Sequence, residues 1–321
     1  MNIVVTGATS FLGAAFTRQL LALGHQVYAV VRPGSANQKA LPQKAEGLVV
    51  LPLALEELGK LPAQVGRDCE VFVHFGWDGA GSANRTRKEL QQRNIEYTMQ
   101  AMEAARALCC RRFLFSGSQA EYGRCTTLMK EEQELYPLSE YGIAKAACYR
   151  HGKEKCRQWQ EQGLWDMEYL HVRIFSIYGP GDHPWTLVNT CLDTFLAGGH
   201  MDLSDCTQQW NFLYVDDCVQ GLLALALHEG RLAEDGIYNI AAKASQTRPL
   251  KEYVEIMHHM CGKRGDYTYG KRANNAEGAV NLIPDISKLC RDTGWEPQVS
   301  FEEGISRMIQ EKQREWEWKE R

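Results

Sequence analysis

The chain has 321 residues, of which 44% are hydrophobic and 24% are charged, the ordinary balance of a globular protein with two cores or one large α/β unit. A formal net charge of -4 gives no basic face for a polyanion, which argues against nucleic acid as a partner. No apolar stretch approaches the about 20 residues that span a bilayer, and no apolar leader precedes the first expected strand, so we expect a cytoplasmic protein without membrane contact.

The cysteines give no sign of a disulfide framework or a metal site. Eleven of them stand at irregular spacings, none in a C-x-x-C pair, and Cys109 and Cys110 are adjacent. This pattern suits free thiols in a reducing compartment. His258, His259 and Cys261 cluster, but no second ligand group has the spacing of a zinc finger, so the sequence predicts no metal.

Strand-like and helix-like segments alternate through the first half of the chain. The expected strands are residues 2–6, 26–31, 48–53, 71–75, 112–116 and 168–176. The expected helices are residues 12–23, 93–108 and 141–162. Strands separated by helix-length segments predict a parallel sheet that is covered on both faces.

The alternation changes after residue 178. We expect a helix-and-loop insertion at about 182–207, strands at 212–215 and 238–240 around a helix at 217–228, and a mostly helical remainder from about 251. The chain is therefore expected to be an α/β protein, a Rossmann doubly wound parallel sheet with a smaller, mostly helical C-terminal substrate lobe. The dinucleotide-binding domain would comprise 1–178 and about 208–243, and the substrate-binding lobe about 179–207 and 244–321.

A glycine-punctuated turn joins the first strand to the first helix, which is where a dinucleotide-binding turn belongs. The helix N-terminus offers N–H groups to a pyrophosphate, and a small hydroxyl stands where a further glycine is usual. The alternative is a tight turn with no ligand. The residues expected to bind the cofactor here are Gly7, Thr9, Ser10, Phe11, Leu12 and Gly13, with Phe75 and Gly76 after the fourth strand.

The end of the second strand bears on the choice of cofactor. Sites for NAD usually have an acidic residue there, which accepts a hydrogen bond from the ribose 2′-hydroxyl. This chain has Arg32, followed by Ser35, and a guanidinium can pair with a 2′-phosphate. The sequence therefore predicts NADP(H) in preference to NAD(H), with a pocket that accepts both as the alternative.

Tyr141 and Lys145 stand four residues apart, on one face of an expected helix. A free tyrosine has a pKa of about 10 and transfers protons poorly at neutral pH. A nearby cation favours the phenolate, so we expect Lys145 to lower the pKa of Tyr141 towards the working range. The pair predicts an acid–base centre.

Together these segments resemble the extended short-chain dehydrogenase/reductase family, in its nucleotide-sugar-modifying branch, along nearly the whole chain. The segments that carry the resemblance are the turn at residues 6–13, Val73-His74-Phe75, Asn94, Phe115 to Gly123, Tyr141 to Lys145, Val172 to Gly181, Phe212 to Asp217 and Pro284 to Lys288.

The resemblance implies roles for individual residues. Ser118 would hydrogen-bond the reacting oxygen, with Ser116 as the neighbouring candidate. Tyr141 would be the acid or base, and Lys145 would activate it and hold the nicotinamide ribose. It also implies a homodimer formed through the helices that begin near Arg93 and Tyr141.

One departure from the family pattern bears on the reaction. Dehydratases of the family have an Asp-Glu pair where this chain has Gln119 and Ala120, which do no acid–base work. Glu121 comes one position later and would point to the opposite face of an extended segment. A dehydratase of that mechanism is therefore not expected.

Other departures bear on the substrate. Trp210 stands where many relatives have a phosphate-binding arginine, and Ser176 where they have an asparagine. Arg272 matches a substrate-phosphate arginine of the C-terminal lobe. We take these three residues as substrate-binding candidates, with packing between the lobes as the alternative for Trp210. Aromatic residues near the cleft, Trp77 and Tyr178, as well as His74, either line it or pack in the core.

The main functional interpretation is an NADPH-dependent reduction of a keto group on a nucleotide-activated, 4-keto-6-deoxy sugar. One alternative is a nucleotide-sugar epimerase with tightly bound NAD. Another is a reductase of a small non-nucleotide carbonyl compound, which Trp210 and Ser176 favour. A non-enzymatic cofactor sensor is disfavoured, because such sensors lose the tyrosine and lysine.

Overall fold

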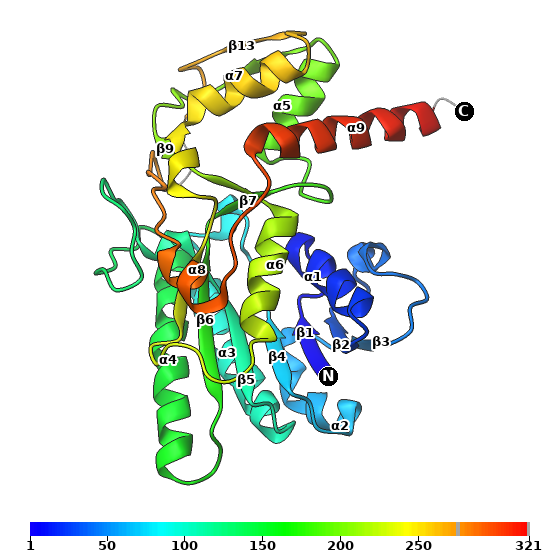
Figure 1. The fold of residues 1–321 in the computed structure, drawn as a ribbon, viewed down its shortest axis with the longest axis vertical. Coiled ribbons are helices and arrows are strands. Elements are labelled where there is room, and N and C mark those ends of the chain that lie inside the picture. The colour runs from blue at the N-terminus through cyan, green and yellow to red at the C-terminus, as the bar shows by residue number, and fades with distance from the viewer. Residues whose placement is uncertain (274–276, 320–321) are drawn as a thin grey trace.

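The structure, a computed structural model, describes residues 1–273 and 277–319. Its centre is a sheet of the strands β1 (Asn2–Thr6), β2 (Gln26–Val31), β3 (Leu48–Pro52), β4 (Val71–His74), β5 (Arg112–Ser118), β6 (Glu168–Ile174) and β11 (Ile237–Ile240). All seven strands are parallel, in the order β11-β6-β5-β4-β1-β2-β3 (Figure 1). The expected Rossmann sheet is confirmed.

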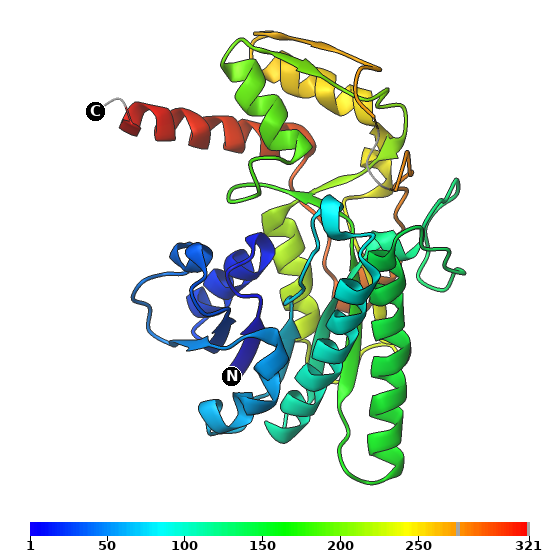
Figure 2. The ribbon, with the colours of Figure 1, turned by 180° about the vertical axis from the view of Figure 1, so that it is seen from behind.

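Helices cover both faces of the sheet. Because side chains alternate along a strand, Ile3 and Val5 of β1 pack on one face and Val4 on the other. The first face is covered by α1 (Phe11–Ala22) and α6 (Val215–Ala226), and the second by α2 (Leu61–Val65), α3 (Lys88–Ala107) and α4 (Glu140–Glu161). Figure 2 shows α3 and α4 side by side on that second face.

The strand order reverses beside β1, which lies between β2 and β4. Thr6 pairs with His74, so β1 and β4 end at the same level of the sheet. In open α/β sheets ligands bind in the crevice beyond the carboxyl ends of the strands at such a reversal. The fold thus points to the ends of β1, β4 and β5 as the place for a site.

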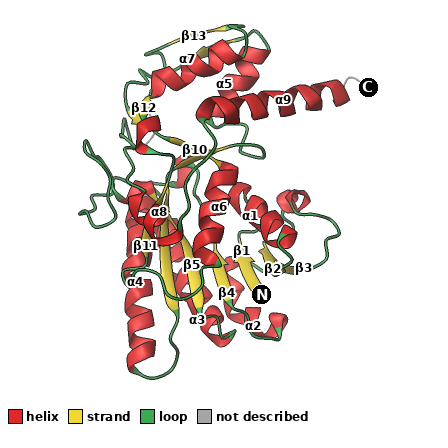
Figure 3. Cartoon of the chain, in the orientation of Figure 1, coloured by secondary structure: helices red, strands yellow, loops and turns green. Residues whose placement is uncertain are grey.

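A smaller lobe lies beyond that carboxyl edge (Figure 3). Its helices α5 (Leu187–Leu196), α7 (Leu250–Met260) and α9 (Phe301–Lys319) enclose a separate apolar cluster around Phe195, Phe212 and Phe301. Three short strand pairs lie outside the central sheet: β7 (Ser176–Tyr178) with β10 (Phe212–Tyr214), β8 (His200–Asp202) with β13 (Asp266–Thr268), and β9 (Gln209–Trp210) with β12 (Arg248–Pro249). The exact division into two domains stays a prediction.

Among the described residues, the remaining short helices are α8 (Ser287–Thr293), which packs against β11 and α6, and five 3-10 turns. These turns are η1 (Ala36–Ala40), η2 (Leu55–Lys60), η3 (Ser82–Asn84), η4 (Gln119–Glu121) and η5 (Ala244–Gln246). Within residues 1–273 and 277–319, the helices are all too short or too polar to cross a membrane.

Two elements differ from expectation. The helix expected from residue 93 begins at Lys88. Its first residues are mostly polar and show no apolar periodicity, so the sequence did not reveal this start. One of them, Gln91, is buried and accepts from the Trp77 indole at 2.9 Å. The strand expected at 168–176 is two strands. Phe175 N still donates to Ile240 O, but from Ser176 the chain leaves the sheet and pairs with β10.

Candidate active site

The turn between β1 and α1 is made by close backbone contacts. Gly7 has a φ of +64°, and a Cβ there would lie 2.7 Å from Gly76 N. A Cβ on Gly13 would lie 2.2 Å from the carbonyl oxygen of Gly7. Both positions therefore require glycine, and they leave the turn open to the approach of a ligand's phosphates.

Ser10 is the N-cap of α1. Its hydroxyl accepts from Gly13 N at 3.0 Å, and its carbonyl accepts from Ala14 N at 2.8 Å. The first N–H groups of a helix have no partner within the helix, and in α1 these include the N–H groups of Phe11 and Leu12. These groups and the helix dipole fit a pyrophosphate, and the turn therefore fits a dinucleotide.

The carboxyl end of β4 completes this side of the site. Gly76 N donates to the Thr6 hydroxyl at 3.2 Å, and a Cβ on Gly76 would lie 2.6 Å from a methyl group of Leu55. Phe75 is buried and packs edge-on against Phe16, with ring centroids 5.4 Å apart. The backbone here lies directly against the glycine turn.

At the end of β2 the Arg32 side chain is 75% exposed, with Nη1 3.9 Å from an Asp78 carboxylate oxygen. Exposed pairs of this kind contribute little free energy, so the guanidinium is available to another anion. Ser35 caps η1, where its hydroxyl accepts from Asn37 N at 3.3 Å. Thr9 lies within the glycine turn itself, between Gly7 and the cap.

Tyr141 and Lys145 project from the first turns of α4 towards the ends of β4 and β5. Lys145 Nζ donates to Ser116 O at 2.6 Å and lies 3.8 Å from the Trp77 ring centroid and 5.6 Å from that of Tyr141. Trp77 packs edge-on against Tyr141 at 5.8 Å. Tyr141 is 8% exposed. Tyr141 and Lys145 therefore lie next to each other, and the Trp77 ring packs against both.

The electrostatics of this pair differ from expectation. Burial raises the pKa of Tyr141, and the charge of Arg85 and a hydrogen bond with Ser118 offset this only in part. Burial also lowers the pKa of Lys145 to about 7. The expected lowering of the tyrosine pKa by Lys145 is wrong for this structure, because both groups are removed from water and desolvation disfavours the charged form of each.

Ser118, rather than Ser116, meets Tyr141. Ser118 is the N-cap of η4, where its hydroxyl accepts from Ala120 N at 3.2 Å and is hydrogen-bonded with the Tyr141 side chain. The Ser116 hydroxyl instead donates to His74 O at 3.2 Å. The structure thus brings Ser118, Tyr141 and Lys145 together.

Glu121 lies below the site rather than in it. The segment after β5 is a 3-10 turn, not the expected extended segment, and within it Glu121 accepts from Ser118 N at 2.8 Å. Its carboxylate pairs with His171 at 2.8 Å and Arg173 at 3.0 Å. Burial acts to raise the pKa of Glu121, but these partners outweigh it and lower that pKa to about 2. Glu121 therefore holds Ser118 in place.

Two of the three residues whose role was open pack in the core. His74 is fully buried, with Nδ1 2.7 Å from the Thr6 hydroxyl, and burial lowers its pKa to about 3. Tyr178 is buried and donates to Phe301 O at 3.2 Å. Trp77 is the one that lies against the candidate acid–base pair.

The substrate candidates are less closely placed. Ser176 opens β7, and Trp210 of β9 packs between the apolar cluster of the sheet and that of the lobe. The indole nitrogen of Trp210 is buried without a hydrogen-bond partner among the described residues. Arg272 follows β13 in the lobe, exposed, with its backbone N–H donating to Leu203 O at 3.1 Å.

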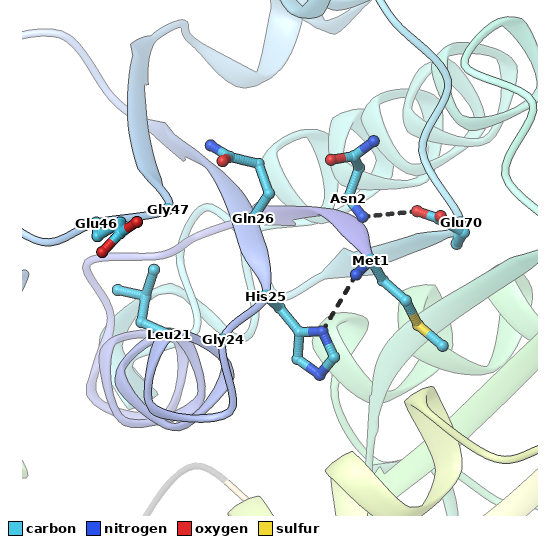
Figure 4. Close-up of a pocket in the computed structure, with 9 residues that line it drawn as sticks. All are labelled: Met1, Asn2, Leu21, Gly24, His25, Gln26, Glu46, Gly47 and Glu70. Atoms are coloured by element: carbon cyan, nitrogen blue, oxygen red, sulfur yellow. Dashed lines mark hydrogen bonds between the residues drawn. The ribbon is translucent and has the colours of Figure 1, made fainter.

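A surface hollow elsewhere does not belong to this site. It is lined by the first residues of β1 and β2, with Leu21, Gly24 and Glu70 around them (Figure 4). Asn2 N donates to the Glu70 carboxylate at 2.6 Å across it. These are the amino ends of the strands, opposite the glycine turn, whereas ligands of such sheets bind at the carboxyl ends.

Comparison with known proteins agrees with the geometry. A family model described as the NAD dependent epimerase/dehydratase family matches residues 3–241, from β1 to the end of β11. The chain belongs to this family. Its members are enzymes of the oxidoreductase type, and among the relatives are epimerases, decarboxylases and a synthase.

Individual relatives of the family match almost from end to end. An uncharacterized UDP-glucose epimerase of Bacillus subtilis is 24% identical over 96% of this chain and 97% of its own length. The CDP-abequose synthase of Salmonella muenchen is 23% identical over 97% and 98%. The solved structure of a UDP-glucuronic acid 4-epimerase from Bacillus cereus, in complex with UDP-glucuronic acid and NAD, has a TM-score of 0.78 at 22% identity, over 97% and 98%.

This family member has two residues at Tyr141 that the sequence did not indicate. Tyr141 N donates to Arg85 O at 2.9 Å, and the Arg85 guanidinium lies 4.7 Å from the Tyr141 ring centroid. Arg85 also pairs with Glu277, which lies between β13 and α8, at 2.8 Å. No local pattern could reveal this, because Arg85 lies in an irregular loop and Glu277 is 192 positions further on.

Proposed function

We propose that this protein is a nucleotide-sugar epimerase that works with a bound nicotinamide dinucleotide. The observation that carries the proposal is the meeting of Ser118, Tyr141 and Lys145 at the carboxyl ends of β4 and β5, beside the glycine turn. The names of the relatives support an epimerase more than the keto-reduction that the sequence alone favoured.

The residues of the turn fit the cofactor's phosphates, and Lys145 would hold the nicotinamide ribose. The N–H groups of Phe11 and Leu12 would bind the pyrophosphate, while Gly7 and Gly13 let it approach the backbone. The bound cofactor supplies a hydride acceptor and, later, a hydride donor.

Tyr141 would move the proton of the reaction. As a phenolate it would accept the proton of a sugar hydroxyl while that carbon is oxidised to a ketone. It would return the same proton to the oxygen when the carbon is reduced from its other face, so that no net oxidation occurs. Ser118 would hydrogen-bond the oxygen throughout, and the Arg85 charge would offset part of the cost of forming the buried phenolate.

Incubation of the purified protein with UDP- and CDP-sugars, without added cofactor, tests this proposal. We expect a 4-epimer to form, and denaturation of the protein to release a dinucleotide. Tyr141→Phe, which keeps the ring, should retain the dinucleotide and lose turnover. Conversion that needs added reduced cofactor in proportion to product would contradict an epimerase.

A second candidate is the NADPH-dependent reduction of a keto group on a nucleotide sugar. The observation that favours it is the exposed Arg32 at the end of β2, where an acid would repel a 2′-phosphate. Dissociation constants for NADPH and NADH measure this preference. If Arg32 contacts a 2′-phosphate, Arg32→Asp weakens NADPH binding alone; equal constants in the unaltered protein would dismiss it.

The substrate and assembly belong to the same proposal. We expect Ser176, Trp210 and Arg272 to contact the nucleotide sugar, and saturation experiments on each alanine variant should show a raised KM. Turnover of small non-nucleotide carbonyl compounds alone would contradict a nucleotide sugar as the substrate.

We also expect a homodimer through α3 and α4. Light scattering measures the mass of the particle in solution and so tests this.

A further inference from the structure

A loop from the nucleotide-binding sheet closes directly over Tyr141. Arg85, which follows η3, anchors this loop because its carbonyl accepts from Tyr141 N at 2.9 Å. Its side chain turns back over the tyrosine, with the guanidinium carbon 4.7 Å from the ring centroid and Nε donating to Ala80 O at 3.0 Å. The backbone and the side chain of one residue therefore hold the same tyrosine.

The segment between β13 and α8 contacts this arginine as well. Glu277 accepts from Arg85 Nη1 at 2.8 Å and from the Ser139 hydroxyl at 2.8 Å. Ser139 is the N-cap of α4 and also accepts from Gly142 N at 3.2 Å. The carboxylate thus joins the loop of Arg85 to the start of the helix that carries Tyr141.

Glu277 is itself held in place by the segment that follows it. Asn281 accepts from Gln209 N at 2.9 Å, and Met129 N donates to Ile283 O at 2.7 Å. Asp285 N donates to Met129 O at 2.9 Å. The Glu277 side chain is only 7% exposed and that of Arg85 only 25%.

In the described part of the chain, four charged side chains from different elements lie around Tyr141. Lys145 lies on its own helix, Arg85 on the loop above it, Glu121 after β5 and Glu277 between β13 and α8. Burial lowers the pKa of Lys145 to about 7, so near neutral pH its charge is only partly present. A guanidinium stays charged at every working pH. Arg85 therefore carries the constant positive charge at this site.

We propose that Arg85 is a positioning residue for Tyr141, which holds its ring and keeps a permanent positive charge beside its phenol, and that Glu277 moderates that charge. This rests on the proposed function only in taking Tyr141 as the proton-transfer group. Arg85 and Glu277 have opposite effects on the pKa of Tyr141, so removing one should shift this pKa in the opposite direction from removing the other.

Ultraviolet titration of tyrosinate in the full chain tests this without substrate, cofactor or activity. The signal of Tyr141 is the difference between each variant and its Tyr141→Phe counterpart. Arg85→Met should raise the Tyr141 midpoint by about one pH unit, because a cation within a few ångströms favours the phenolate. Glu277→Gln should lower it, because the opposing carboxylate is gone.

Arg87→Met is the matched control, since Arg87 is exposed two residues away and should leave the midpoint unchanged. Arg85→Lys keeps a charge without the planar fork, so a smaller shift than in Arg85→Met is expected. It also serves if Arg85→Met does not fold. Circular dichroism at each pH confirms that the variants remain folded over the titration.

The pH profile of kcat/KM gives a second readout once a substrate is known. The limb that reports Tyr141 should move upward in Arg85→Met and downward in Glu277→Gln. Unchanged midpoints, or shifts of both variants in one direction, would overturn the proposal and leave Arg85 a structural clamp. A folded protein with the expected titration but no epimerase activity would contradict the proposed function and not this inference.

Discussion

The two halves of the site are built in different ways. The cofactor side is made of backbone: two glycines without room for a Cβ, and a helix N-terminus. The acid–base side is made of side chains from four separated segments, whose charges act on one buried phenol. The cofactor side depends on close packing of backbone atoms, and the acid–base side depends on charges. Substitutions on the first side should therefore change cofactor affinity and stability, and substitutions on the second should change turnover.

The largest expected effect is on the electrostatic half. Tyr141→Phe removes the group that exchanges the proton in the proposed mechanism, and general acid–base catalysis typically contributes roughly 100- to 10,000-fold in rate. We expect kcat to fall by that order while the dissociation constant of the dinucleotide stays within about twofold. Steady-state kinetics and calorimetry measure the two quantities. A large loss of cofactor affinity would show that the halves are not separate.

The steric half should show the reverse pattern. In Gly13→Ala the new methyl group would lie 2.2 Å from Gly7 O, so the turn must open. We expect at least a tenfold loss of cofactor affinity and a destabilisation of about 1–3 kcal/mol. Gly59→Ala, where a Cβ meets nothing within 4 Å, is the control. Unfolding in urea with and without cofactor distinguishes lost binding from lost stability.

The same contrast explains what the sequence could predict. β1 and β2 match expectation to the residue, because an apolar run between turn residues is a local signal, and the glycine turn is equally local. Ser118, Tyr141 and Lys145 were found through motifs that lie within 28 residues of one another.

What the sequence could not predict depends on how distant segments meet. The contact of Arg85 with Glu277 joins residues 192 positions apart, which no local pattern relates. The sign of the Tyr141 pKa shift depends on burial, which no spacing reveals. The turn after β5 is different, because it is local: it was expected to be extended, although the spacing of Ser118 and Glu121 is that of the capping box which the structure shows.

Lys145 links the electrostatic half to stability. Its pKa in the folded protein is lowered to about 7 from 10.5, so between these values the unfolded chain binds more protons than the folded one. The free energy of unfolding should therefore rise with pH across this window, relative to Lys145→Met. Urea unfolding at several pH values measures the difference, with Lys88→Met, at an exposed lysine at the start of α3, as the control for loss of a lysine.

The smallest effect is expected at the N-cap of α1, where a side chain supports the backbone turn of the cofactor side. Ser10→Ala removes the hydroxyl that accepts from Gly13 N, and loss of an N-cap costs about 1 kcal/mol. The N–H groups offered to a pyrophosphate are those of Phe11 and Leu12, so cofactor affinity should change by less than about threefold. Ser35→Ala, at the cap of a short exposed turn, should destabilise the protein less. If Ser10→Ala instead weakens the cofactor as much as Gly13→Ala does, the hydroxyl contacts the phosphates, and the cofactor half depends on a side chain as well as on backbone.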